Sequence, residues 1–134
     1  MIPDRIIEQG TLTTDGARTS VEVRIPWYRA LPASCISGAS LTVDGVTAPA
    51  ESLRWTMNGR TRTFAEMTTD VEDWWFPVDS AVLSGDVPAT AGGDHEVTVT
   101  LTLYIPYIVI GAAEVLHIDE RATKTMTART EVAA

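Results

Sequence analysis

The chain has 134 residues, of which 45% are hydrophobic, and its 10 basic and 18 acidic side chains give a formal charge of −8. An acidic chain without a basic cluster is a poor match for nucleic acid or an anionic membrane, because both need cationic surfaces. No segment approaches the roughly 20 apolar residues of a membrane-spanning helix. The first residues also lack the basic and apolar regions of a secretory signal, so we expect a cytoplasmic protein.

β-branched residues dominate the composition, with 19 threonines, 13 valines and 9 isoleucines, and they favour strands over helices. In chain order, the first clear alternation of apolar and polar residues, at 20–25, predicts a strand with one buried face. Asp44-Gly45 and Asn58-Gly59 each separate two strand-like segments and are typical of tight hairpin turns. The alternation is strictest at 97–104 and returns more weakly at 122–129, as expected of an edge strand.

These segments predict an all-β fold over one domain, residues 1–134. Asp15-Gly16 and Gly92-Gly93 mark two further turns, whereas only residues 65–70 could form a helical turn. About eight or nine short strands imply two packed antiparallel sheets, in a β-sandwich or jelly-roll-like arrangement.

The motif Ile-Pro-aromatic ends two predicted strands, at Ile25-Pro26-Trp27 and at Ile105-Pro106-Tyr107. Because proline has no N–H to donate, each motif should interrupt strand pairing or lie at a sheet edge. The motifs are either matching corners of a sandwich or sites that present aromatic rings to a ligand or another chain. The sequence leaves both interpretations open.

A self-sufficient active site is not predicted. His117, Asp119 and Glu120 have the side chains for a metal site, but a solvated surface group is the more common role. His95 is expected to cap the turn that precedes it. Cys35 has no basic neighbour in the sequence that would activate it, and as the one cysteine it excludes an internal disulfide, so we expect a small buried side chain. We therefore assign no catalytic and no metal-binding residue.

Residues 66–79 form the densest cluster of acidic and aromatic side chains. Trp74, Trp75 and Phe76 are consecutive, and consecutive side chains of a strand point to opposite faces. In one interpretation, Trp74 and Phe76 face the core while Trp75 covers a loop. In the other, the rings form a binding surface for a protein or a sugar.

The chain resembles the small β subunit of bacterial C-glycoside deglycosidases over about residues 5–110. The resemblance rests on five segments that follow in the same order: Arg24-Ile-Pro-Trp-Tyr-Arg-Ala-Leu-Pro-Ala-Ser-Cys-Ile36, Leu41-Thr-Val-Asp-Gly45, Met57-Asn-Gly59 with Glu66-Met67, Trp74-Trp-Phe-Pro-Val-Asp79, and His95-Glu-Val-Thr-Val-Thr-Leu-Thr-Leu-Tyr-Ile-Pro-Tyr-Ile108. The segment after Gly111 is less similar.

This resemblance implies half of a carbon–carbon lyase. In the family, a larger TIM-barrel-like α subunit carries a divalent metal, expected to be manganese, and the small β-sandwich subunit binds to it without contributing a catalytic group. The substrate is a C-glycoside whose sugar is oxidised at C3. The ketone acidifies the C2 proton, whose loss gives an enediolate, and the aglycone then leaves from C1. A partner that supplies metal and base agrees with the lack of a complete site in this chain.

Two hypotheses follow, and they belong to different functional classes. The chain is either the accessory β subunit of such an enzyme or a free-standing carbohydrate-binding sandwich that stacks sugars on Trp27, Trp74 or Trp75. In the first hypothesis, replacing Trp75 or Tyr107 by alanine should weaken assembly more than folding. The residues assigned to the α-subunit contact are Trp27, Tyr28, Arg29, Trp74, Trp75, Phe76 and Tyr107.

Overall fold

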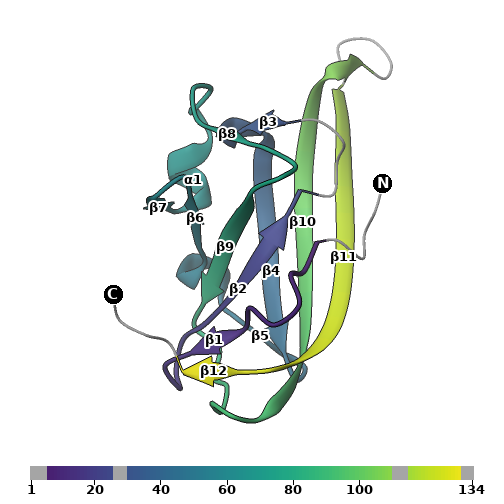
Figure 1. Ribbon diagram of the computed structural model, residues 1–134. Coiled ribbons are helices and arrows are strands. Elements are labelled where there is room, and N and C mark those ends of the chain that lie inside the picture. Colours follow the sequence, from purple (N-terminus) through teal and green to yellow (C-terminus); the bar gives the residue numbers. More distant parts are fainter. Residues whose placement is uncertain (1–5, 26–29, 110–114, 131–134) are drawn as a thin grey trace.

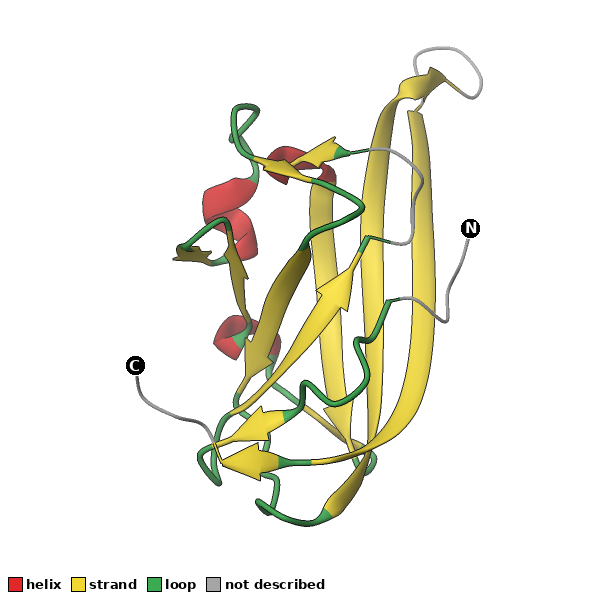
Figure 2. Ribbon diagram, viewed as in Figure 1, coloured by secondary structure: helices red, strands yellow, loops and turns green. Residues whose placement is uncertain are grey.

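The computed structural model describes residues 6–25, 30–109 and 115–130, with the backbone alone at 105–109 and 115–117 (Figure 1). Strands dominate these residues, and the helical parts are short (Figure 2). In chain order the elements are β1 Thr13–Thr14, β2 Thr19–Arg24, β3 Leu31–Pro32, a 3-10 turn at Ala33–Cys35, β4 Ile36–Val43, β5 Val46–Thr47, a 3-10 turn at Ala50–Ser52, β6 Arg54–Met57, β7 Arg60–Arg62, α1 Phe64–Met67, β8 Trp74–Trp75, β9 Ser80–Gly85, β10 Asp94–Val109, β11 Val115–Thr127 and β12 Arg129–Thr130.

The strands form two larger sheets and one small one. The six-stranded sheet has the order β12-β1-β2-β9-β6-β7, the four-stranded sheet has the order β11-β10-β4-β5, and β3 pairs with β8. Neighbouring strands are antiparallel except β1 and β12, which form a short parallel pair. The chain is therefore all-β, as the sequence predicts.

Alternating apolar residues from both larger sheets meet in one core, which makes the arrangement a sandwich. Val21 and Val23 of β2 face inward from one sheet, and Val97, Val99 and Leu101 of β10 face inward from the other. The strict alternation of β10 thus separates its buried valines and leucines from the threonines between them. Both strands confirm the predicted buried faces.

Both predicted hairpin turns are present. Asp44 and Gly45 have φ of 50° and 83°, and Asn58 and Gly59 have φ of 54° and 78°. These positive values are those that a two-residue hairpin turn requires, and asparagine, aspartate and glycine reach them at the lowest cost. The turns join β4 to β5 and β6 to β7.

The strand lengths differ from the expected short strands. The described residues contain twelve strands, two of which are long: β10 has 16 residues and β11 has 13. The weak alternation at 122–129 belongs to β11, which is an edge strand as predicted. The register of β10 against β11 shifts between Ile105 and Val109, the stretch that contains Pro106, and this confirms an interruption of pairing there. Pro26 lies outside the described residues.

The helical turn lies close to its predicted place. Helix α1 begins at Phe64, and the Thr63 hydroxyl accepts a hydrogen bond from the N–H of Glu66, whose carboxylate accepts one from the N–H of Thr63. This reciprocal pair is a capping box, which explains why so short a helix begins at this position. Among the described helices, none is long and apolar enough to span a membrane.

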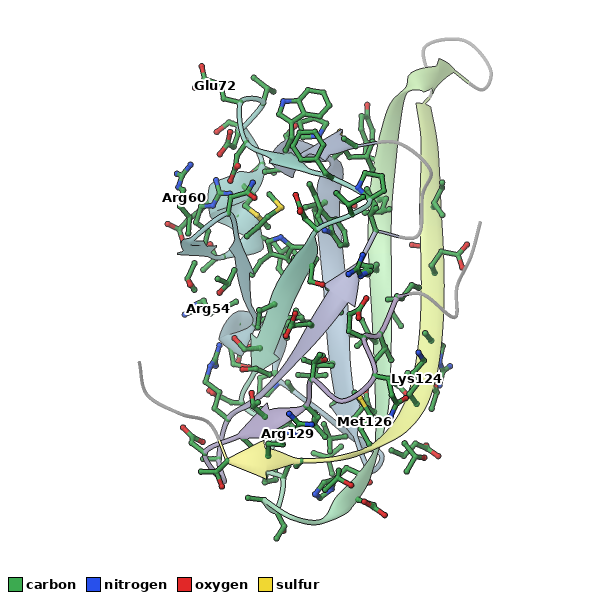
Figure 3. The ribbon with its side chains drawn as sticks, viewed as in Figure 1. Arg54, Arg60, Glu72, Lys124, Met126 and Arg129 are labelled. Carbon is green, nitrogen blue, oxygen red and sulfur yellow. The ribbon has the colours of Figure 1, made fainter. Side chains whose placement is uncertain are left out.

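The N-terminal segment closes one side of the sandwich. Ile7 forms an isolated bridge with Val23 of β2. From the other sheet, the ammonium group of Lys124 in β11 donates to the Ile7 carbonyl at 2.9 Å. Figure 3 shows Lys124 on this strand, beside Met126, whose sulfur accepts a hydrogen bond from the N–H of Gly10. The segment therefore connects the two sheets.

The two ends of the sandwich are formed by different strands and turns. Arg24, the last residue of β2, is the strand-register partner of Ser80, and Leu103 of β10 is that of Ile36. These residues lie at the end of the sandwich near β3 and β8, which we call the aromatic end (Figure 1). The opposite end, which we call the turn end, carries the β4–β5 turn and the start of β10.

A histidine and a carboxylate hold the turn end together. The Nδ1 atom of His95 lies 2.5 Å from Oδ2 of Asp44, and its Nε2 atom lies 3.0 Å from the carbonyl oxygen of Thr90. The other oxygen of Asp44 accepts a hydrogen bond from the N–H of Glu96 at 2.8 Å. His95 therefore caps its turn as predicted, and it also ties the start of β10 to the β4–β5 hairpin.

This contact shifts the pKa values of both side chains. The hydrogen bond to Asp44, followed by the one to Thr90, raises the pKa of His95 above its ordinary value. The hydrogen bond from His95, followed by the one from Glu96, lowers the pKa of Asp44. The protonated histidine thus stabilises the fold fully below its unfolded pKa of about 6.5, and this stabilisation is lost as the pH rises through the higher folded value.

Replacing His95 by glutamine should lower the melting temperature more at pH 5.5 than at pH 9, because the charged contact exists only at the lower pH. Thermal unfolding of both proteins, followed by circular dichroism at the two pH values, measures the difference. An equal loss at both would show that the His95 charge contributes nothing.

Candidate partner-binding surface

Exposed apolar side chains gather at the aromatic end. We call residues 70–79, which lead from α1 through β8 to β9, the aromatic loop. Of the five large hydrophobic side chains exposed among the described residues, four belong to this loop, and the fifth, Val46, lies at the turn end. The four are Val71, Trp74, Phe76 and Val78. Apolar exposure concentrated in one short segment is typical of a binding surface.

The middle tryptophan of the loop points the other way. Trp75 is fully buried, and its ring meets the ring of Trp55 edge-on, with centroids 4.9 Å apart. Its indole N–H donates to the carbonyl oxygen of Asp79 at 3.0 Å. Trp75 therefore anchors both ends of the loop segment that follows it.

This geometry corrects two expectations. Trp74 and Phe76 are 40% and 48% exposed, so the interpretation that placed them in the core and Trp75 outside is wrong. Trp75 also cannot be the partner contact that the sequence suggested, because its whole side chain is packed inside the fold. Consecutive rings along β8 point to opposite sides, as the alternation predicts, but the ring that faces the core is that of Trp75.

A buried arginine holds the aromatic loop. Arg62 of β7 has a side chain only 7% exposed, and its guanidinium donates to the carboxylates of Asp70 and Asp73, the latter at 2.7 Å. A buried cation requires such compensation, because an unpaired charge in the interior is strongly unfavourable. The two aspartates are therefore held close to the same guanidinium, and this fixes the path of the chain between them.

Hydrogen bonds within the loop and from two neighbouring segments complete it. Oδ1 of Asp70 accepts from the N–H groups of Glu72 and Asp73, both at 3.0 Å. These two backbone bonds, followed by the Arg62 guanidinium, lower the pKa of Asp70 to about 2. The Asn58 amide donates to Asp73 at 2.6 Å and to the Trp74 carbonyl at 2.9 Å. The carbonyl oxygens of Asp70 and Asp73 accept N–H groups from the 3-10 turn at 33–35.

Two acidic side chains of the loop face solvent. Glu72 and Asp79 are exposed, and Figure 3 shows Glu72 at the outer tip of the loop, away from the strands. Within the part of the chain that the structure describes, neither carboxylate has an ion-pair or hydrogen-bond partner. The surface thus combines exposed apolar rings with uncompensated negative charge.

The remaining predicted contact residues are not described at side-chain level. Trp27, Tyr28 and Arg29 lie outside the described residues, and Tyr107 is placed only as backbone, in β10. Of the seven predicted residues, the structure therefore brings Trp74 and Phe76 to one exposed surface and places Trp75 beneath it. Sequence reasoning missed Arg62, because nothing in a short polar strand signals that its charge is buried.

The structure also shows the surroundings of Cys35 and Asp119, which were considered for nucleophilic or metal chemistry. Cys35 is buried as predicted, and burial raises the pKa of its thiol. The carboxylate of Asp119 accepts a hydrogen bond from the Thr102 hydroxyl at 2.8 Å, and the side chain of His117 lies outside the described part. Across residues 6–25, 30–104 and 118–130, no three histidine, cysteine, aspartate or glutamate side chains are grouped as a metal site would require.

A model of the C-glycoside deglycosidase beta subunit family matches residues 6–107. The chain belongs to this family. The matched range includes both hairpin turns, Arg62 and the whole aromatic loop, so the features that shape this surface lie inside the region that defines the family.

Three relatives are similar over nearly their whole length. A C-glycoside deglycosidase beta subunit from Microbacterium trichothecenolyticum is 70% identical, over 96% of this chain and 98% of the relative. One from Arthrobacter globiformis is 62% identical, over 94% and 96%. A 3'-dehydrocarminate deglycosidase beta subunit from a Microbacterium species is 36% identical, over 94% and 95%.

Replacing Arg62 by methionine should lower the free energy of unfolding by about 3 kcal/mol, because two nearly buried carboxylates lose their cation. Arg60 gives a matched control: it lies 3.5 Å from Asp70 but is 60% exposed, so its replacement by methionine should cost less than about 1 kcal/mol. Urea unfolding measures both values. Equal losses in the two variants would contradict the structural role of Arg62.

Replacing Trp75 by alanine should lower the free energy of unfolding by about 3–5 kcal/mol, since it opens a cavity beside Trp55. The same change at Trp74 should cost less than about 1 kcal/mol, because much of that ring is already in water. Chemical denaturation of the two variants tests this order, and a Trp74 variant at least as unstable as the Trp75 variant would contradict it.

Proposed function

We propose that this chain is the β subunit of a heteromeric C-glycoside deglycosidase, a carbon–carbon lyase that separates sugar and aglycone in 3-oxo C-glycosides. Membership of the beta subunit family supports the subunit role. Similarity to relatives over almost their whole length supports the same assignment for the complete described fold. The name of one relative specifies a 3'-dehydro substrate, which supports an oxidised sugar as the substrate class.

The chemistry explains why the sugar must be oxidised first. An aryl C–C bond at C1 has no leaving-group heteroatom, but a ketone at C3 acidifies the C2–H bond. A base removes that proton, the electron pair forms an enediolate across C2 and C3, and its return expels the aglycone carbon from C1, where a C1–C2 double bond forms. The aglycone carbon then takes up a proton. A divalent metal, which we assign to the α subunit, supplies stabilisation of negative charge.

This chain would contribute binding rather than chemistry. Several of its acidic side chains already have structural roles. Asp70 and Asp73 form ion pairs with Arg62. Asp44 binds His95, and Asp94 accepts a hydrogen bond from Thr127 at 2.5 Å. These engagements support a base and a metal site in the α subunit, which we take to be a TIM-barrel-like protein.

The aromatic end is the proposed contact with the α subunit. The exposure of Trp74 and Phe76 is the observation that carries this assignment. The backbone of β10 extends beyond its last pair with β4, at Leu103, toward Tyr107 at the same end. Trp27, Tyr28 and Arg29 remain part of the proposal.

Co-expression with the α subunit of the Microbacterium trichothecenolyticum enzyme should give a complex that elutes as one species in size-exclusion chromatography. The complex should release aglycone from a 3-oxo C-glycoside and leave the unoxidised C-glycoside intact. Either subunit alone should be inactive. A chain that never co-elutes with the α subunit, and instead binds sugars saturably with quenching of its tryptophan fluorescence, would favour a carbohydrate-binding module.

Metal removal separates the roles of the two subunits. Chelation should abolish the activity of the complex, and added Mn²⁺ should restore it, because the metal stabilises charge in the reaction. The melting temperature of the isolated β chain should not change under the same treatment. A shift in that temperature would locate a metal site in this chain and contradict the assignment.

A further inference from the structure

The charges and exposed rings of the aromatic loop indicate which kind of partner surface would complement it. Four carboxylates lie in the loop, at residues 70, 72, 73 and 79. Two of them, Asp70 and Asp73, form ion pairs with the buried guanidinium of Arg62. The two that remain, Glu72 and Asp79, flank Trp74 and Phe76 in the sequence and are exposed.

Among the residues that the structure describes, the neighbouring cations do not compensate these two carboxylates. Arg60 lies 3.5 Å from Asp70, so Arg60 and Arg62 together face the two carboxylates of Asp70 and Asp73. The Arg24 side chain, at the end of β2, forms an ion pair with Glu8 and donates a hydrogen bond to the Val78 carbonyl. The loop therefore presents an apolar centre whose edge keeps a negative charge.

We propose that the α subunit receives Trp74 and Phe76 in an apolar pocket whose rim carries arginine or lysine side chains that face Glu72 and Asp79. This inference rests on the proposed function and adds the chemistry of the partner surface. Burying the rings removes apolar area from water, and a cationic rim complements the two free carboxylates. The ion pairs and hydrogen bonds around Arg62 hold the loop before binding, so little ordering remains to oppose association.

A second copy of this chain fits the same surface poorly. A symmetric contact places the same patch on both sides, so Glu72 and Asp79 of one copy would approach the same acidic patch of the other. The formal charge of −8 on each chain adds repulsion at longer range. A cationic partner surface meets neither penalty.

The test uses the full chain and the α subunit of the Microbacterium trichothecenolyticum enzyme, with association and dissociation rates measured by biolayer interferometry. Replacing both Trp74 and Phe76 by alanine should weaken binding about tenfold or more, mainly through faster dissociation. Glu72→Arg should slow association severalfold at about 50 mM NaCl, and the difference should shrink at about 500 mM because salt screens the attraction.

Matched variants at the turn end control for general effects. Val46→Ala removes an exposed apolar side chain, and Glu96→Arg reverses an exposed charge, both far from the aromatic loop along their strands. Both should bind with wild-type kinetics. Circular dichroism and melting temperature confirm that every variant is folded, because none of the substituted side chains lies in the core.

Each contrary result has a distinct meaning. Tight wild-type binding with unchanged kinetics in the double variant would overturn the assigned surface, and faster or unchanged association of Glu72→Arg would overturn the cationic rim. A dimer of the isolated chain that the double variant dissociates would assign the surface to a second copy. Sugar-dependent quenching that is lost in the double variant would assign it to a carbohydrate. Failure of the wild-type chain to bind the α subunit would contradict the proposed function itself.

Discussion

The buried guanidinium of Arg62 is the interaction on which the aromatic loop depends. Its side chain is 7% exposed, so Asp70 and Asp73 must stay beside it to avoid an unpaired interior charge. With these two residues fixed, the chain between them has little conformational freedom. Hydrogen bonds from the N–H groups of Glu72 and Asp73 to Asp70 restrict it further. Trp75 then enters the core, and the residues on either side of it face outward. The ion pairs of Arg62 thus hold the backbone that leads into β8, from which these rings project.

The same arrangement explains how an exposed pair of rings remains compatible with a stable fold. Trp74 and Phe76 expose apolar area to water, which is unfavourable, but the chain around them is held by contacts that the rings do not make themselves. The backbone of the loop is therefore held by contacts other than those of these two rings. Adjacent residues therefore differ in their environment: Trp75 packs in the core, and Trp74 and Phe76 are exposed and available to the proposed partner.

The features that could be predicted from the sequence are local. Alternation located β2 and the inward face of β10, and Asp-Gly and Asn-Gly located both hairpins, because a few adjacent residues determine each of these structures. The orientation of residues 74–76 could not be predicted, because alternation fixes only that neighbours face opposite ways. The side that faces the core depends on Trp55 and Asp79, which meet Trp75 only in the folded chain. The role of Arg62 is hidden for the same reason.

The two ends of the sandwich respond differently to pH, and this follows from the acids that each uses. At the turn end, the His95–Asp44 contact gains strength as histidine becomes protonated, so it varies within the range that cells experience. At the aromatic end, two backbone N–H groups and the Arg62 guanidinium lower the pKa of Asp70 to about 2, which is far below that range. Protonation can therefore change the stability of the sandwich while the loop that displays Trp74 and Phe76 keeps its conformation. The aromatic loop, held by ion pairs to a strongly ionised aspartate, is independent of the titrating end of the molecule.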